Sequence, residues 1–379
     1  MRQVVRILLI FAAMALASAP GYPGYDGYID LHPEGWKESA AVCINLRGDV
    51  AGYGVTGRGE RGFLWSGGRI AEIVPPGADS SRASWVNGNG DVAGTAVVGG
   101  VSHAFLLSDG RYLDPTPGWA YSTAVFVGDD GTVAGLGEFG AYISRNGVTE
   151  IIPGFTDVVG GNSAGQLIGK KDNNARLYDP GRGYLDVTPP LAAEAVPGAI
   201  NENGLVALTS SSSGGVQKGF VYSDGWFIQM TPQGWDTSHA KAVNNLAAVV
   251  GFGDSQGTRR SFVRKGADYE FIEFPGWAST EAVSLNDGGQ VAGSGLTASG
   301  ERHAFAASPA GTSTGPDSGQ GATASGGGGC AMVPGAAGSG ASAGSAVDAA
   351  LLALPLLVLL GRRFRKQTAG AGPLTLRRS

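Results

Sequence analysis

Short segments of alternating apolar and polar residues fill the chain between residues 27 and 310. Gly, Asn, Asp and Pro separate these segments, and apolar residues do not recur at the spacing of a helix. Alternation with a period of two, bounded by turn residues, is typical of β-strands joined by tight turns. In the first stretch the pattern predicts strands over residues 40–46, 49–56, 62–66 and 69–74. The chain is therefore expected to be an all-β protein.

The same four-strand pattern returns along the chain. Its clearest mark is an Asn-x-x-Gly turn that leads into a Val-Ala-Gly strand, first seen as "NLRGDVAG" from Asn45. Related segments begin at residues 87, 128, 162, 201, 244 and 286, so there are seven copies. A unit of four strands and about 40 residues has the size of one β-propeller blade.

The two ends of the repeated region complement each other. The seventh copy reaches "HAFAAS" and stops after its third strand, whereas residues 28–31 form a fourth strand with no unit before it. A ring in which the N-terminal strand completes the last blade would account for both ends. Such closure leaves no terminal blade uncovered. The sequence thus predicts a seven-bladed β-propeller of four-stranded blades over residues 26–308, with an open β-solenoid as the alternative.

Aromatic residues follow the fourth strand of most units and are the candidate ligand-binding residues: Trp36, Trp119, Phe155, Trp235 and Trp277. In a propeller these connections share one face with the links between the second and third strands, which vary most here. Exposed rings on that face could stack on sugars or hold a protein loop. Alternatively the rings pack between blades, and their regular recurrence favours this interpretation.

Other polar residues give no catalytic, metal or cofactor site. The carboxylates Asp30, Glu72, Asp114, Glu150, Asp186 and Glu273 follow the repeat, whereas an acid–base pair should interrupt it. We expect them to face water on the outermost strands. His103 and His303 fall where other units carry Arg or Lys, so polar caps at strand starts are expected, and His32 and His239 lack metal-ligand spacing.

Composition and charge narrow the possible partners. The chain has 379 residues, 65 of them Gly, and a formal net charge of −5. A net negative charge without a basic stretch provides no field that attracts a phosphate backbone, so nucleic acid is not an expected partner.

The ends of the chain predict export. Residues 1–19 combine Arg2 and Arg6, an apolar run and small residues at the end, as a signal peptide does. Residues 309–346 form a Gly/Ala/Ser-rich linker, expected to be disordered, that contains "GGGGC". A short hydrophobic helix and a basic stop with Arg362 and Arg363 follow over residues 347–366, then a tail over 367–379. The apolar run is short for a permanent anchor but places the C-terminus at a membrane.

Two resemblances add to this picture. "HAF" at residues 103–105 and 303–305, each after a "VAG" strand, resembles the extracellular HAF repeat of bacterial secreted proteins. Residues 326–366 resemble the Cys-bearing C-terminal sorting signals called JDVT-CTERM and MYXO-CTERM, although the spacer 331–347 is long and a tail follows the basic stop. This second resemblance implies a sorting protease of the inner membrane as a partner, processing near Gly328 and Gly329, and a modified Cys330.

Cys43 lies in a predicted strand, where it suits a core position. A disulfide with Cys330 is possible in an oxidising compartment, although spacing gives no support for it. Together these features predict a non-catalytic binding or scaffold propeller, secreted or displayed on the envelope of a Gram-negative bacterium. A glycan or another surface protein would be its ligand. Two alternatives stay open: a secreted polysaccharide lyase or glycosidase, which needs a non-repeating carboxylate pair or His/Tyr/Arg cluster, and a structural envelope protein.

Overall fold

The computed structural model describes residues 24, 25 and 27–310. These residues form strands, turns and connections, and none of them lies in a helix. No segment of this part therefore has the helical length and apolarity that a membrane crossing requires. The predicted signal peptide, nearly all of the linker, the hydrophobic segment and the tail lie outside the described residues, as do Gly328, Gly329, Cys330, Arg362 and Arg363.

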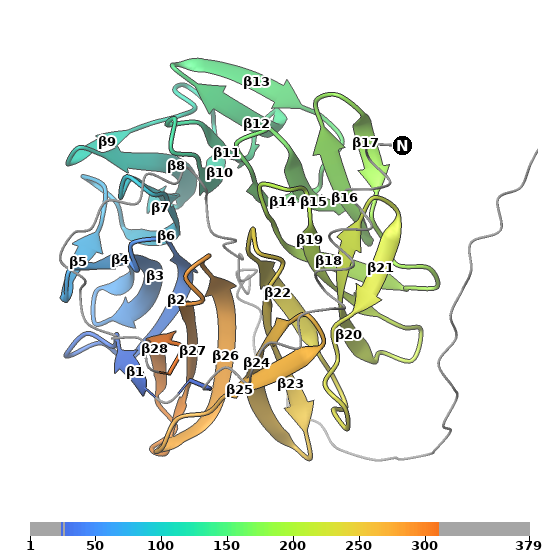
Figure 1. Cartoon of the computed structure of the whole chain (residues 1–379). Helices are drawn as coiled ribbons and strands as arrows, with labels where there is room; N and C mark the ends of the chain where they lie inside the picture. Colours follow the sequence, from blue (N-terminus) through green and yellow to red (C-terminus); the bar gives the residue numbers. More distant parts are fainter. Residues whose placement is uncertain (1–23, 26, 311–379) are drawn as a thin grey trace, which may run out of the picture. The chain divides into compact units, whose positions relative to one another are not determined.

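Seven antiparallel sheets of four strands each stand around a common centre (Figure 1). The predicted seven-bladed β-propeller is confirmed. Blade 1 is β2–β5, blade 2 is β6–β9, blade 3 is β10–β13, blade 4 is β14–β17, blade 5 is β18–β21, blade 6 is β22–β25, and blade 7 is β26–β28 with β1.

Each blade has an innermost first strand, and its other strands follow outward in hydrogen-bonding order. The first strands are β2 (Glu38–Ile44), β6 (Ser80–Val86), β10 (Ser122–Val127), β14 (Asp157–Gly161), β18 (Glu194–Ile200), β22 (His239–Val243) and β26 (Trp277–Leu285). The second are β3 (Val50–Thr56), β7 (Val92–Val98), β11 (Val133–Gly137), β15 (Leu167–Lys171), β19 (Val206–Ser211), β23 (Val249–Ser255) and β27 (Val291–Thr297). The third are β4 (Gly59–Ser66), β8 (Val101–Ser108), β12 (Gly140–Arg145), β16 (Asn174–Asp179), β20 (Gln217–Ser223), β24 (Thr258–Lys265) and β28 (Arg302–Ser308). The outermost are β5 (Arg69–Ile73), β9 (Arg111–Leu113), β13 (Val148–Ile152), β17 (Gly183–Asp186), β21 (Trp226–Gln229), β25 (Asp268–Ile272) and β1 (Gly27–Asp30).

The N-terminal strand completes the last blade, as the sequence predicts. β1 runs antiparallel to β28, with Tyr28 opposite Ala307 and Asp30 opposite Phe305, so blue and orange strands lie side by side in Figure 1. Leu31, directly after β1, is fully buried. Because strands from both ends share this sheet, the ring is closed by backbone hydrogen bonds and by apolar burial.

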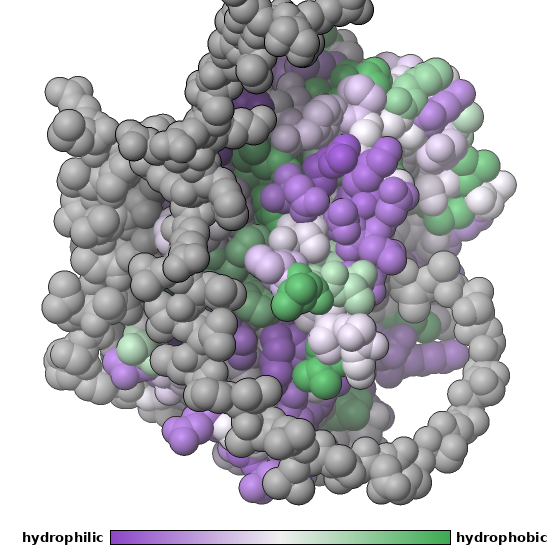
Figure 2. Space-filling model, turned by 90° about the vertical axis from the view of Figure 1, so that its right-hand side faces the viewer, coloured by the Kyte–Doolittle hydropathy of each residue, from purple (hydrophilic) through white to green (hydrophobic). Residues whose placement is uncertain are grey.

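Connections lie on two faces of the ring. We call the face with the hairpins between second and third strands the upper face, and it also carries the connections from one blade to the next. The lower face carries the other hairpins, including the Asn-x-x-Gly turns. The outermost strands are the most exposed, and the carboxylates that follow the repeat are exposed on these strands or, for Asp114 and Glu273, directly after them. The side of the molecule in Figure 2 shows hydrophilic and hydrophobic described residues mixed together.

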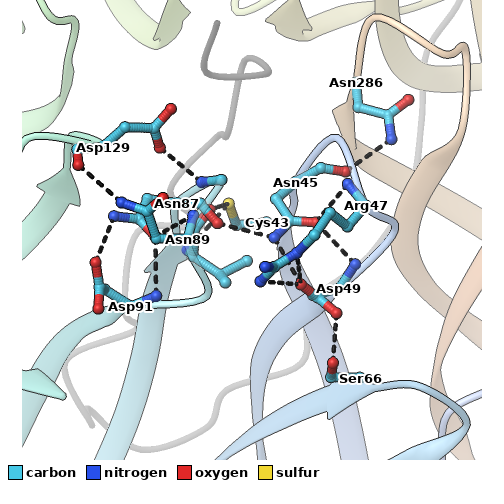
Figure 3. Close-up of polar contacts among 12 residues, drawn as sticks. Cys43, Asn45, Arg47, Asp49, Ser66, Asn87, Asn89, Asp91, Asp129 and Asn286 are labelled. Carbon is cyan, nitrogen blue, oxygen red and sulfur yellow. Dashed lines mark hydrogen bonds and ion pairs between the residues drawn. The ribbon is translucent and has the colours of Figure 1, made fainter. Parts of the chain in front are cut away.

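A ring of asparagines, which we call the asparagine ladder, links neighbouring blades near the centre of the lower face. Asn45 donates from Nδ2 to the carbonyl of Asn87 at 2.8 Å, and Asn286 donates to the carbonyl of Asn45 at 2.7 Å (Figure 3). The same bond joins Asn87 to Gly128, Asn162 to Asn201, Asn201 to Asn244 and Asn244 to Asn286. Each ladder asparagine is buried, so these bonds form away from water and tie the blades together.

Candidate functional site

The aromatic residues predicted to form a ligand-binding face pack against their own blades. A Cβ atom on Gly54 would lie 2.4 Å from the Trp36 ring, and one on Gly137 would lie 2.7 Å from Trp119. Trp235 covers Gly253 and Trp277 covers Gly295 in the same way, and Phe155 lies over Gly169. The four tryptophan rings also meet an aromatic residue of the third strand edge-on, as Trp36 does with Phe63 and Trp277 with Phe305. Phe155 instead meets Tyr184 of the outermost strand. The recurring rings therefore have a packing role in every blade that carries one.

Blades without the tryptophan support this role. Ala78 and Ala192 make the same backbone turn as Trp36, each donating to the carbonyl three residues before it. In those blades the glycine is replaced as well, by Ala96 and Ser210 in the same strand register. A blade with a tryptophan at the turn thus has Gly on its second strand, whereas a blade with alanine at the turn has Ala or Ser on that strand. The half-buried rings of Trp36, Trp119 and Trp277 keep part of their surface accessible on the upper face.

Two cavities lie where residues depart from the repeat. The first has a volume of about 500 Å³ and opens between blades 3 and 4 on the lower face. Its walls include Ile143, Val148, Glu150 and Tyr178. Burial raises the pKa of the Tyr178 hydroxyl, and the Glu150 charge adds to this effect.

The asparagine ladder is interrupted at this same junction. Gly128 stands where the other blades carry Asn, so it has no side chain to offer the carbonyl of Asn162. Elsewhere a Ser or Thr near the start of a blade also accepts a hydrogen bond from the third strand of the preceding blade, as Ser39 does from Ala304 at 2.9 Å. At the same place in blade 4, Thr156 bonds instead to Lys170 within its own blade. Blades 3 and 4 are thus held together by fewer side-chain bonds of the repeating kinds.

The second cavity, of about 400 Å³, lies between blades 6 and 7 on the upper face. We call it the 6–7 rim site, and it is lined by Asp254, Gly257, Thr258, Arg259, Ala278, Ser279, Glu281, Gly295, Leu296 and Arg302. Arg259 bonds Asp254 at 3.0 Å and Glu281 at 2.8 Å. Arg302 bonds the other oxygen of Glu281 at 3.0 Å. A chain of alternating charges therefore crosses from blade 6 to blade 7.

The ion pairs keep both carboxylates of the rim site ionised. The hydrogen bonds from Arg259 hold the pKa of Asp254 below its usual range. Burial alone would raise the pKa of Glu281, but the bonds and charges of Arg259 and Arg302 outweigh it and lower that pKa. On the neighbouring strand β22, burial lowers the pKa of Lys241 and brings the pKa of His239 to about 4, which for these basic groups favours the neutral form.

Sequence reasoning missed the rim site because its residues lie on five strands and one turn that only the folded propeller brings together. One signal was available. At the β26 position of Glu281 the other blades carry Ala40, Arg82, Thr123, Asp157, Val196 and His239, so this position breaks the repeat.

Sequence reasoning also missed a contact between two histidines: the His32 ring stacks on the His303 ring, with centroids 3.9 Å apart. His303 in turn bonds Asp30 at 2.8 Å. Within the described part of the chain no three His, Cys, Asp or Glu side chains gather to hold a metal ion.

Fold and site together define a class: a seven-bladed β-propeller with cavities at two of its blade junctions. Neither a family model nor a curated protein matches the chain. Among solved structures, YCF48 bound to the D1 peptide is similar with a TM-score of 0.50 and 12% identity, over 78% of this chain and 100% of that one. A streptogramin B lyase follows at 0.49 and 14%, over 76% and 100%. The BP39L lectin from Burkholderia pseudomallei is similar at 0.41 and 14%, over 71% and 98%. At such low identity the likeness supports the fold alone.

Proposed function

We propose that the chain is a non-catalytic binding or scaffold propeller at the surface of a Gram-negative bacterium. The observation that carries this proposal is the chemistry of the 6–7 rim site. Its carboxylates are held ionised by two arginines, so they accept hydrogen bonds well but are poorly suited to donate a proton as a general acid. A glycosidase needs one carboxyl group that stays protonated near the working pH.

The shape of the site supports binding as well. It is a cavity at the rim of two blades, lined by donors and acceptors from both, in the size range of small-ligand sites. A polymer can lie across such an open rim, with one of its units in the cavity. Partners of this kind are a glycan or a loop of another surface protein.

Binding of polymer can be separated from cleavage in one experiment. The chain is purified as the cell exports it and incubated with acidic and neutral surface polysaccharides. We expect a fraction of the polymer to sediment with the protein and to keep its original length on size-exclusion chromatography. Shortened polymer would support the secreted lyase or glycosidase instead. If no polymer is retained, and none of the bacterium's surface proteins is retained in a parallel incubation, the structural envelope role gains support and the binding proposal fails.

The surface location rests on the two ends of the chain. The proposed signal peptide directs export, and the proposed sorting signal directs an inner-membrane protease to the region of Gly328, Gly329 and Cys330, with Arg362 and Arg363 on the cytoplasmic side. Mass spectrometry of the mature protein tests this part. We expect a C-terminus near residue 330, and a chain that still ends at Ser379 would contradict it.

A further inference from the structure

The 6–7 rim site has a counterpart of opposite polarity elsewhere in the ring. Between blades 1 and 2, Glu60 of the third strand pairs with Arg82 of the next first strand, and the Arg82 guanidinium lies 4.2 Å from the centre of the Tyr53 ring. Arg259 and Glu281 occupy the corresponding places between blades 6 and 7. Blade 7 adds Arg302 to the same carboxylate, so this junction carries two guanidinium groups for Glu281.

The two arginines keep donors available to a ligand. A guanidinium has five N–H donors. Within the described residues, Arg259 uses Nε, one Nη1 and one Nη2 proton on Asp254 and Glu281. In the same part of the chain, Arg302 uses Nη2 alone, on Glu281 and on Ser294. Their side chains are 40% and 36% exposed, so the remaining donors can face the cavity.

The charges that line the site balance one another. Arg259 and Arg302 bring two positive charges, and Asp254 and Glu281 bring two negative charges. Burial disfavours the charged forms of the neighbouring Lys241 and His239, because it lowers the pKa of the lysine and brings that of the histidine to about 4. An anion would therefore be held by the unused donors of the two guanidinium groups and not by a net positive field.

The remaining wall suits the rest of a sugar ring. Thr258 and Ser279 bring hydroxyl groups, and carboxylate oxygens of Asp254 and Glu281 can accept from ligand hydroxyls. Leu296, which is 40% exposed, and Ala278 offer apolar surface for C–H groups. Donors for an anionic group, acceptors for hydroxyls and a small apolar wall are what a sugar acid requires.

We propose that the 6–7 rim site binds the carboxylate of a hexuronic acid unit, with Arg302 and Arg259 as its donors. This inference rests on the proposed binding function and names the class of ligand for that same site. The cavity takes one unit of an acidic polysaccharide, and the open rim lets the polymer continue on either side.

Calorimetric titration of the exported full chain tests the proposal, with D-glucuronate, D-glucose and inorganic phosphate as separate probes. We expect glucuronate to bind at least tenfold more tightly than glucose, and phosphate to compete poorly. Arg302→Gln should weaken glucuronate binding roughly tenfold, because it removes a charged hydrogen-bond donor from the ligand's carboxylate. Arg58→Gln is the matched control, since it removes one charge from an exposed pair with Glu72 far from the site and should leave binding unchanged.

A second variant tests the same site in case Arg302→Gln does not fold. Thr258→Trp keeps every charge and fills the cavity from the β23–β24 hairpin, and it should abolish glucuronate binding while circular dichroism stays native. Equal affinity for glucuronate and glucose, equal competition by phosphate, or full affinity in both variants would overturn the proposal. If polymer is still retained in the sedimentation experiment while Arg302→Gln binds as wild type, this inference fails and the binding function stands.

Discussion

Ala247 occupies a left-handed backbone position, with a φ of 60°, in the lower hairpin of blade 6. The same place in the other hairpins holds glycine, at Gly48, Gly90, Gly131, Gly165, Gly204 and Gly289. For an L residue with a Cβ atom this conformation costs about 1–2 kcal/mol, whereas glycine adopts it freely. One hairpin of the ring is therefore strained at the level of a single residue.

We expect Ala247→Gly to raise the free energy of unfolding by about 1 kcal/mol, because it relieves this strain. Urea denaturation followed by tryptophan fluorescence measures the change. Gly289→Ala is the reverse substitution in blade 7, where the new Cβ would also meet Pro309 at 3.2 Å, and it should destabilise the protein. A lower stability for Ala247→Gly would show that the αL position carries no strain.

At the scale of the element, the recurring aromatic residue packs its side-chain ring over a glycine of the second strand in each blade that carries it. Trp119 lies over Gly137, meets Tyr142 edge-on at 5.3 Å and contacts the exposed Phe139 at 5.2 Å. The ring fills the upper end of blade 3, where the short second strand leaves room for it. Its contribution to packing is therefore separable from any contact with a ligand.

Trp119→Ala should lower the free energy of unfolding by about 2–3 kcal/mol, somewhat less than a fully buried Trp→Ala change because the ring is half-exposed. Thermal unfolding measures this loss. Trp226→Ala removes a ring that is 53% exposed on the outer strand β21 and should cost well under half as much. Equal stability of Trp119→Ala and wild type would remove the packing role and leave ligand contact as the reason for the ring.

At the scale of the whole molecule, the ring is closed twice. β1 pairs with β28 in blade 7, and Asn286 of blade 7 bonds the carbonyl of Asn45 in blade 1. Asn286 is fully buried, and its Oδ1 also accepts from the Gln290 amide at 3.0 Å. The asparagine ladder is thus part of what holds the last blade to the first.

Asn286→Ala should destabilise the protein by about 2–3 kcal/mol, because it removes the buried side-chain bond to the Asn45 carbonyl and the part-buried bond from the backbone N–H of Gln290. Asn89→Ala is the control: it removes a side chain of the same kind, bonded to Asp129 at an exposed site, and should change stability by under about 1 kcal/mol. Differential scanning calorimetry compares the two. A small effect of Asn286→Ala would mean that strand pairing alone closes the ring.

The repeat explains why so much of the fold was predictable. Strand positions, the blade size and the completion of blade 7 by β1 follow from alternation and turn residues, which are local signals. The residues of the 6–7 rim site carry no such signal, since Asp254, Glu281 and Arg302 are far apart in sequence and each looks like a solvated charge on its own.

Local patterns in the chain were enough to establish the all-β class, the seven blades and the pairing of the two ends of the repeated region, because period-two patterning and turn chemistry act over a few residues and repeat. The tertiary structure alone decided which polar side chains of different blades contact one another. The asparagine ladder, its interruption at Gly128, the stacked His32 and His303 rings and the charged rim site all form between neighbouring blades. Contacts of this kind depend on how sheets pack around the ring, and no local pattern encodes that geometry.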